Sequence, residues 1–531
     1  MGLDYGTPFL AGHGVWSNMQ AIRSVGMPHD LFYKQQGKHQ GAYVSDMMVH
    51  LFHLVTDITK GGAQTATLRD LFEAMRLYVC KALFRFSVCV LCFDVKSVVP
   101  VSKRPIQATR RSKNEPLTKQ QYKQLRENGI ITSWNAIRST TGAVAWILQQ
   151  LEIWFRTEFE MPQPRTTQDS VTLIVHGLAD QPGQALHFEL DNKPDAQVDK
   201  GTIDVPVIGE GEIQVVYWLN KISKYMPVCG VSIDKDTIAI ALLANQRCDA
   251  LDTHSVYTFR HRKLFHTIVE SMVSKHAFKS KPYRSCPDLT ANPHEYDKKG
   301  KITDLPFLDI KGFSREIETM FKHHKVDVTC PQATWVLFMV FVGCDFVDKK
   351  VLHNFNGERL MEGYLKLGKH APSVLRLTLD DPDEPFKIEF AEKVFLRFVF
   401  YFLKQHNSGK KKGCVYDKKR VKVAARQAFW VVSYWANAIL GSEHVPNPIR
   451  LDDEGLSYWG WTDEDLVVEE VEKVSKTLVS DHSRIVKRIE RKRNDKKMVG
   501  ETGIKRKRDD DNDAPKSTKR QKKLSESGRK G

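Results

Sequence analysis

Acidic residues recur in this sequence where buried, strand-like segments end. In a parallel α/β sheet the carboxyl ends of the strands share one edge, so acids far apart in the sequence are brought together there. Such a cluster of carboxylates repels itself unless cations neutralise it, and hard oxygen ligands in an open site suit Mg²⁺, with Mn²⁺ as an alternative. Two such ions about 4 Å apart activate a water and stabilise the leaving oxygen in phosphodiester hydrolysis. The candidate metal ligands are Asp46, Asp94, Glu210, Glu212, Asp234, Asp236 and Asp345.

The elements that must position these acids are visible as short apolar runs. Ala42–Asp46 and Ser87–Asp94 are strand-like and end in an acid, and the helical spacing of apolar residues from Thr65 to Phe84 predicts a helix between them. This order predicts a βαβ unit with a parallel sheet. Further strands are expected at Val171–Val175, Val205–Ile208 and Val228–Ile233. The predicted fold class is therefore α/β, with a mostly parallel central sheet flanked by helices.

The sequence motifs around the acids resemble those of the flap endonuclease/XPG superfamily of 5′ nucleases. Gly209–Gln214 resembles its E-x-E/D-A-Q element, Ser232–Asp236 its S-x-D-x-D strand end, and Val342–Phe346 its G-S-D-Y after an apolar helix. Phe93–Asp94 is similar to its F-D-G, Val44–Met47 to its first I/V-D, and the opening Met1-Gly2 also matches. The resemblance implies a PIN-like core and a two-metal phosphodiesterase in which Glu210 and Asp234, with Lys103 and Arg104, act on the scissile phosphate.

The sequence also departs from this family, and other functions stay open. The spacing from Asp236 to Asp345 requires an insertion, the expected glycine-rich turn is replaced by Val347–Leu352, and Val95 stands where F-D-G has its glycine. The G-E-G-E and G-x-D-F wording is also similar to the 5′→3′ exoribonuclease branch. The alternatives to a nuclease that cuts flapped or branched DNA in replication, repair or recombination are thus an exoribonuclease, a catalytically inactive nucleic-acid-binding protein on the same fold and, less favoured, a scaffold protein.

Basic residues predict contacts with a nucleic acid and import into the nucleus. The resemblance implies that the basic stretch after Asp94 forms the base of an arch over the 5′ end of the nucleic acid. A later basic loop, which precedes a helix, is expected to contact phosphates. The predicted nucleic-acid-binding residues are Lys103, Arg104, Arg110, Arg111, Lys410, Lys411, Lys412, Lys419 and Arg420. The predicted nuclear localisation residues, which would bind an import receptor, are Lys505, Arg506, Lys507, Arg508, Lys519, Arg520, Lys522 and Lys523. A sliding-clamp motif is not evident.

Composition is consistent with a polyanionic partner. The 531-residue chain carries a net charge of +16, and the stretch from Asp481 to Gly531 has 19 Lys/Arg against 9 Asp/Glu. Nine cysteines without a paired pattern favour a reducing compartment. We expect Cys89 and Cys92 to be structural, and Trp430 and Trp435 to pack in a core. The absence of a signal peptide or a long apolar stretch predicts a soluble intracellular protein that does not bind membranes.

The expected organisation follows these motifs along the chain. Two nuclease halves are separated by a helical arch or insertion and followed by a second insertion, a helical C-terminal region and a basic disordered tail. The predicted boundaries are 1–110 and 170–245 for the two halves, 111–169 for the arch, 246–325 for the second insertion, 326–475 for the helical region and 476–531 for the tail.

Overall fold

A computed structural model of the chain describes the residues that carry its main elements. They all belong to one compact unit that ends at Val471. The described ranges are 41–59, 66–83, 86–95, 114–164, 168–179, 181–226, 228–232, 236–245, 256–259, 307–344, 346–347, 357–381, 383–407, 416–441 and 444.

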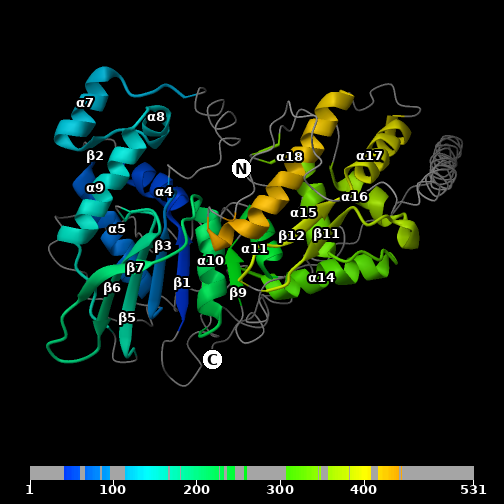
Figure 1. Cartoon of the computed structure of the whole chain (residues 1–531). Coiled ribbons are helices and arrows are strands. Elements are labelled where there is room, and N and C mark those ends of the chain that lie inside the picture. The colour runs from blue at the N-terminus through cyan, green and yellow to red at the C-terminus, as the bar shows by residue number, and fades with distance from the viewer. Residues whose placement is uncertain are drawn as a thin grey trace, which may run out of the picture. The chain divides into compact units, whose positions relative to one another are not determined.

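An eight-stranded, mostly parallel sheet forms the centre of this unit, in the order β10-β9-β8-β1-β3-β5-β6-β7 (Figure 1). Its middle strands are mutually parallel: β9 (Val256–Phe259), β8 (Val228–Val231), β1 (Ala42–Asp46), β3 (Val88–Cys92) and β5 (Ser170–His176). Antiparallel strands extend both edges: β10 (Phe307–Asp309) at one, and β6 (Gln184–Asp191) with β7 (Asp199–Asp204) at the other. Parallel strands buried on both faces account for the near-continuous apolar runs of β1 and β3.

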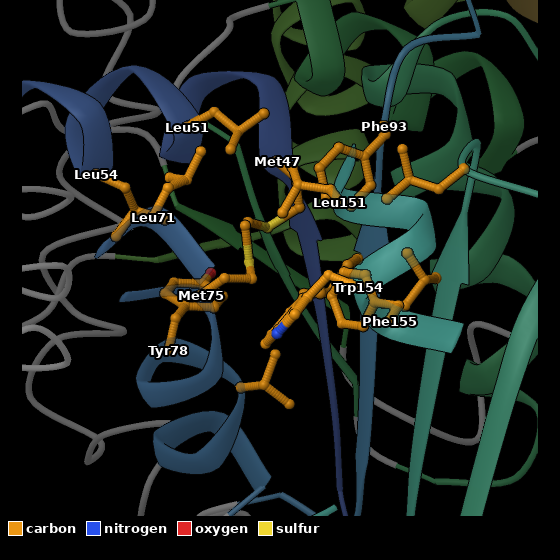
Figure 2. Packing of buried hydrophobic residues seen from close by; sticks show 14 of the residues in the cluster. Met47, Leu51, Leu54, Leu71, Met75, Tyr78, Phe93, Leu151, Trp154 and Phe155 are labelled. Carbon is orange, nitrogen blue, oxygen red and sulfur yellow. The ribbon is translucent and has the colours of Figure 1, made fainter. Parts of the chain in front are cut away.

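Helices cover both faces of the sheet. One layer holds α4 (Met47–Thr59), α5 (Leu68–Leu83), α8 (Trp134–Ser139) and α9 (Ala143–Thr157), whose side chains meet β1 and β3 in the cluster shown in Figure 2. The opposite face carries α10 (Gly211–Ser223), which contacts β1, β3 and β8 and also α11 (Asp236–Ala244). A polar helix, α7 (Lys119–Asn128), precedes α8, and the short strands β2 (Ala66–Thr67) and β4 (Ile130–Ile131) pair.

A mostly helical region follows the sheet. In it α15 packs on α14, α16 and α18, and α18 also contacts α11 and α17. Its elements are α14 (Ile310–His323), α15 (Pro331–Phe341), α16 (Gly357–Leu365), η5 (Gly368–His370), β11 (Leu375–Thr378), β12 (Lys387–Phe390), α17 (Glu392–Asn407), α18 (Lys418–Asn437) and η6 (Ala438–Leu440). Trp430 and Trp435 are buried in α18, as predicted. Every helix among the described residues is too short or too polar to cross a lipid bilayer.

The structure differs from the sequence-based expectations about secondary structure in three places. Val205–Ile208 forms no strand: Pro206 has no N–H to pair, and Val205 N–H donates to the Gly183 carbonyl at 2.9 Å. The β6–β7 hairpin was missed because most residues of β7 are exposed and lack apolar alternation. The segment 246–325, expected to be an insertion, supplies β9, β10 and α14, so part of it belongs to the central sheet.

One glycine is required where β5 ends. Gly177 has φ +90°, and a Cβ there would lie 2.0 Å from the Phe93 carbonyl oxygen. The close approach allows Phe93 N–H to donate to the His176 carbonyl at 2.9 Å, which extends the β3–β5 pairing beyond Cys92. Gly177 therefore fixes the position of the residues that follow β3.

Replacing this glycine is expected to destabilise the protein. Gly177→Ala adds the strain of a positive φ to a clash with backbone, so we expect the free energy of unfolding to fall by at least about 2 kcal/mol. Gly201→Ala is the matched control, because Gly201 lies on exposed β7 and its added Cβ would meet nothing within 4 Å. Urea denaturation of both variants measures the difference, and an equal effect would contradict this role of Gly177.

Candidate functional site

Parallel pairing aligns the carboxyl ends of three neighbouring strands. In the register of β1 with β3, Asp46 lies opposite Cys92, and Asp94 follows two residues later. In the register of β1 with β8, Ser232 follows the last paired residue of β8 and comes next to Asp46. The three strand ends thus meet at the edge where a parallel α/β sheet presents its ligand site.

The alternation of side chains places Asp46 on the α10 side of the sheet. Tyr43 and Ser45 of β1 point to α5, where their hydroxyls lie 2.7 and 2.9 Å from the Tyr78 hydroxyl. Asp46, one residue further, points to the opposite face. There its Oδ2 accepts a hydrogen bond from Ser232 Oγ at 3.5 Å. Asp46 is 2% exposed, so this carboxyl group is almost fully buried.

Two carboxylates converge on the first residue of α10. Gly211 N–H donates to Asp94 Oδ1 at 2.9 Å. A Cβ on Gly211 would lie 3.1 Å from Asp46 Oδ1 and 3.3 Å from Asp94 Oδ1. Glu210 is the buried N-cap residue of α10, and Glu212 lies in its first turn. Two predicted ligands, Asp46 and Asp94, thus meet at a helix N-terminus, whose partial positive charge favours anions, and two more, Glu210 and Glu212, belong to the first residues of that helix.

Hydrogen bonds to the backbone of its two neighbours in the sequence hold Asp94 in place. The side-chain Nε2 of Gln214, on α10, donates to the carbonyls of Phe93 and Ile208, both at 2.9 Å. The next residue, Val95, donates its N–H to the Gly209 carbonyl at 2.8 Å. The sequence did not predict a structural role for Gln214. Its place as the last residue of the motif Gly209–Gln214 is the feature that could have indicated one.

Asp46 has a structural role of its own. Its Oδ1 accepts the N–H of Met48, in the first turn of α4, at 3.1 Å. This bond satisfies an amide that the helix leaves unpaired, as an N-cap residue does. On the Ser232 side, Thr237 Oγ1 donates to Ser232 Oγ at 2.9 Å, which ties the start of α11 to the same strand ends. Asp236, another predicted ligand, is buried in the first turn of α11.

The chemistry of the donors fits a hard cation. The carboxyl groups supply oxygen ligands, which Mg²⁺ and Mn²⁺ prefer. Cys92 is opposite Asp46, but burial, together with the nearby Asp46 carboxylate, raises the pKa of its thiol far above the usual range. Burial likewise raises the pKa of the Cys89 thiol. Both cysteines are buried and protonated, which agrees with the structural role expected for them.

Several predicted residues cannot be placed at this site. No group of three or more His, Cys, Asp and Glu side chains arranged to hold a metal ion occurs within the described ranges. The complete ligand set therefore stays a prediction. Lys419 and Arg420 are exposed at the start of α18. The predicted residues outside the described ranges are Asp234, Asp345, Lys103, Arg104, Arg110, Arg111, Lys410, Lys411, Lys412 and all of the nuclear localisation residues.

Comparison with models of known protein families and with curated proteins found no match for this chain.

A buried histidine borders the site. His176 ends β5 beside Cys92, and Trp218 Nε1 of α10 donates to its Nδ1 at 3.1 Å. Its other ring nitrogen therefore carries the proton, and a hydrogen bond with the Pro206 backbone uses it. Burial, opposed in part by that hydrogen bond, lowers the pKa of His176 to about 4. The neutral ring is thus built into the contact between α10 and the sheet.

Acid is expected to weaken this contact. With a pKa of about 6.5 in the unfolded chain, His176 binds its proton more readily there than in the fold, so its stabilising contribution is complete above pH 6.5 and is lost as the pH falls towards 4. Between pH 7.5 and 5 the loss is about 2 kcal/mol. His176→Asn keeps a neutral acceptor for Trp218 and should remove this part of the pH dependence of unfolding.

The control for that measurement is His187→Asn, which removes a half-buried histidine from neighbouring β6. The free energy of unfolding is compared at the two pH values for both variants. Identical pH dependence in the wild type and in His176→Asn would show that this ring does not stay neutral in the folded protein.

Proposed function

We propose that the protein is a Mg²⁺-dependent 5′ nuclease of the flap endonuclease/XPG kind, with a PIN-like core, that hydrolyses phosphodiesters of flapped or branched DNA. The observation that carries the proposal is the convergence of Asp46 and Asp94 on the N-terminus of α10. Their Oδ1 atoms lie 3.1 and 3.3 Å from the position of a Cβ on Gly211. These acids come from different strands, at the edge of the sheet where ligands bind.

The residues that would hold the metal are Asp46, Asp94, Glu210, Glu212, Asp234, Asp236 and Asp345. When bound, two divalent ions supply an activated water and stabilise the leaving oxygen. The protein's own part is positional: Gln214 and the β3–β5 pairing hold Asp94, and Gly211 leaves room between the two carboxylates. Lys103, Arg104, Arg110 and Arg111 are proposed to orient the phosphate and to stabilise the charge that develops on it.

Two further candidates rest on specific observations. The Gly209–Glu212 wording favours a 5′→3′ exoribonuclease acting on single-stranded RNA with a 5′ phosphate. A nucleic-acid-binding protein without catalysis is favoured by the bonds of Asp46 and Asp94, since each accepts an amide at a helix N-terminus and this role requires no metal. Nuclear location is part of the main proposal and rests on the basic clusters at Lys505–Arg508 and Lys519–Lys523.

Cleavage of two labelled substrates distinguishes these functions. A 5′-flap DNA and a 5′-phosphorylated single-stranded RNA are incubated with Mg²⁺ and with the wild type or Asp94→Asn. The amide keeps an acceptor for Gly211 N–H but loses the charge, so the fold is retained while the rate falls at least about 100-fold, equivalent to about 2.7 kcal/mol of barrier. Asp199→Asn, on exposed β7, is the matched control and should cleave like the wild type.

The substrate that is cut decides between the candidates. Flap cleavage that depends on Asp94 supports the DNA nuclease, whereas cleavage of RNA alone moves the protein to the exoribonuclease branch. Binding of both substrates without cleavage of either would leave the nucleic-acid-binding protein. Equal rates for Asp94→Asn and the wild type would exclude the site described above.

A further inference from the structure

Two helices outside the candidate site form an antiparallel pair. Arg426 Nε of α18 donates to both carboxylate oxygens of Glu392, at the start of α17, each at 3.1 Å. Further along α17, Phe400 stacks on Tyr416, which precedes α18, with ring centroids 6.1 Å apart. Glu392, at the start of α17, contacts the middle of α18, whereas Phe400, later in α17, contacts Tyr416 just before α18. The two helices therefore run in opposite directions (Figure 1).

Exposed basic residues follow one face of α17. Lys393, Arg397 and Lys404 are exposed and recur at intervals of four and seven residues, which places them on one side of a helix. Phe400 lies three residues after Arg397 and four before Lys404, so it belongs to the same side. Because Phe400 contacts Tyr416, this basic row borders α18.

A second basic row follows the neighbouring face of α18. Lys418 and Lys422 are exposed and four residues apart, and Arg426, four residues later, contacts α17 through Glu392. From Lys418 to Asn437 the helix has no acidic residue, and its N-cap is Asp417, which accepts Lys419 N–H at 2.8 Å. The two rows therefore lie side by side on a surface with a large excess of positive charge.

We propose that this surface, formed by Arg397 and Lys404 of α17 with Lys418 and Lys422 of α18, binds the sugar–phosphate backbone of a nucleic acid duplex. This binding surface extends the function proposed above, and it rests on that function in one respect, namely that the substrate is a nucleic acid. Lys and Arg contact phosphates without regard to sequence, so the surface would hold an arm of the substrate and would not read its bases.

The geometry favours a duplex over a single strand. Packed helices lie about 8–10 Å apart, close to the roughly 12 Å width of the DNA major groove, so two rigid rows can face phosphates on either side of a groove. The α17 row is about 16 Å long, which matches several base-pair steps. Single-strand sites display aromatic rings for stacking on bases. The half-buried rings on this surface, Phe400 and Tyr416, stack on each other, so one face of each ring is already covered.

The surface also has a rigid support. The second half of α18 is buried, and Phe346 packs against its Trp430, Tyr434 and Trp435, with ring centroids about 6 Å apart. Phe390, which precedes α17, stacks on Phe429 at 4.9 Å. These contacts fix the direction of both helices. The basic side chains therefore project from rigid helices and not from a free loop.

The test measures binding separately from cleavage. Full-length protein is titrated in EDTA with a labelled blunt DNA duplex and with one of its single strands, and fluorescence anisotropy is recorded from 50 to 300 mM salt. The test variant carries Arg397→Gln, Lys404→Gln, Lys418→Gln and Lys422→Gln. The control variant carries Lys221→Gln and Lys224→Gln, two exposed lysines at the end of α10.

For the test variant we expect the affinity for the duplex to be at least about tenfold weaker at 0.1 M salt. The slope of log affinity against log salt should become shallower by about 3 to 4, because each phosphate contact contributes about 0.9 to that slope. The control should shift little, and single-strand binding should change less than duplex binding. Unchanged duplex affinity and slope, or a loss confined to single strands, would overturn the proposal. Because no cleavage is involved, the binding result stands apart from the outcome of the nuclease assay.

Discussion

The close approach of Gly211 to two carboxylates is the constraint on which the arrangement of the site depends. Burying a carboxylate costs several kcal/mol unless hydrogen bonds or opposite charge compensate. Here Asp94 accepts the first amide of α10 at 2.9 Å, and Asp46 accepts an amide in the first turn of α4 at 3.1 Å. Each acid therefore faces the positive end of a helix. The fold can hold both acids before any cation arrives, and a cation would use the remaining oxygen lone pairs.

The packing of the sheet supplies the precision that this arrangement needs. Phe93 is the clearest example: its ring is buried with α4 and α9, while its N–H and carbonyl are bonded to His176 and Gln214. The residue after Phe93 is Asp94, so a core side chain and two backbone bonds together decide where its carboxylate lies. On β1 the hydroxyl contact of Ser45 with Tyr78 has the same consequence for Asp46. Alternation along each strand then separates the apolar core from the acids.

The parts of this structure that sequence predicts are those in which one physical signal dominates. β1 was predicted with its observed bounds, and β3 and β8 within two residues, because buried parallel strands are almost wholly apolar and each is followed by an acid. The β6–β7 hairpin has no such pattern, since backbone pairing and not burial maintains exposed β7. Gly177 and Gln214 depend on contacts with Phe93 across more than 80 residues of sequence, and no local pattern contains those contacts.

The helix α18 joins the proposed binding surface to the elements that pack beside the candidate site. Its exposed first turns carry the basic row, whereas its buried second half packs against α11 and α15 and continues into η6, which contacts α10. Phe346, the neighbour in sequence of the predicted ligand Asp345, packs on the same buried half. The same helix therefore carries the basic row at one end and, at the other, contacts α11 and η6, both of which pack on α10. That continuity is a physical reason for a long helix to join a charged surface to the edge of the sheet.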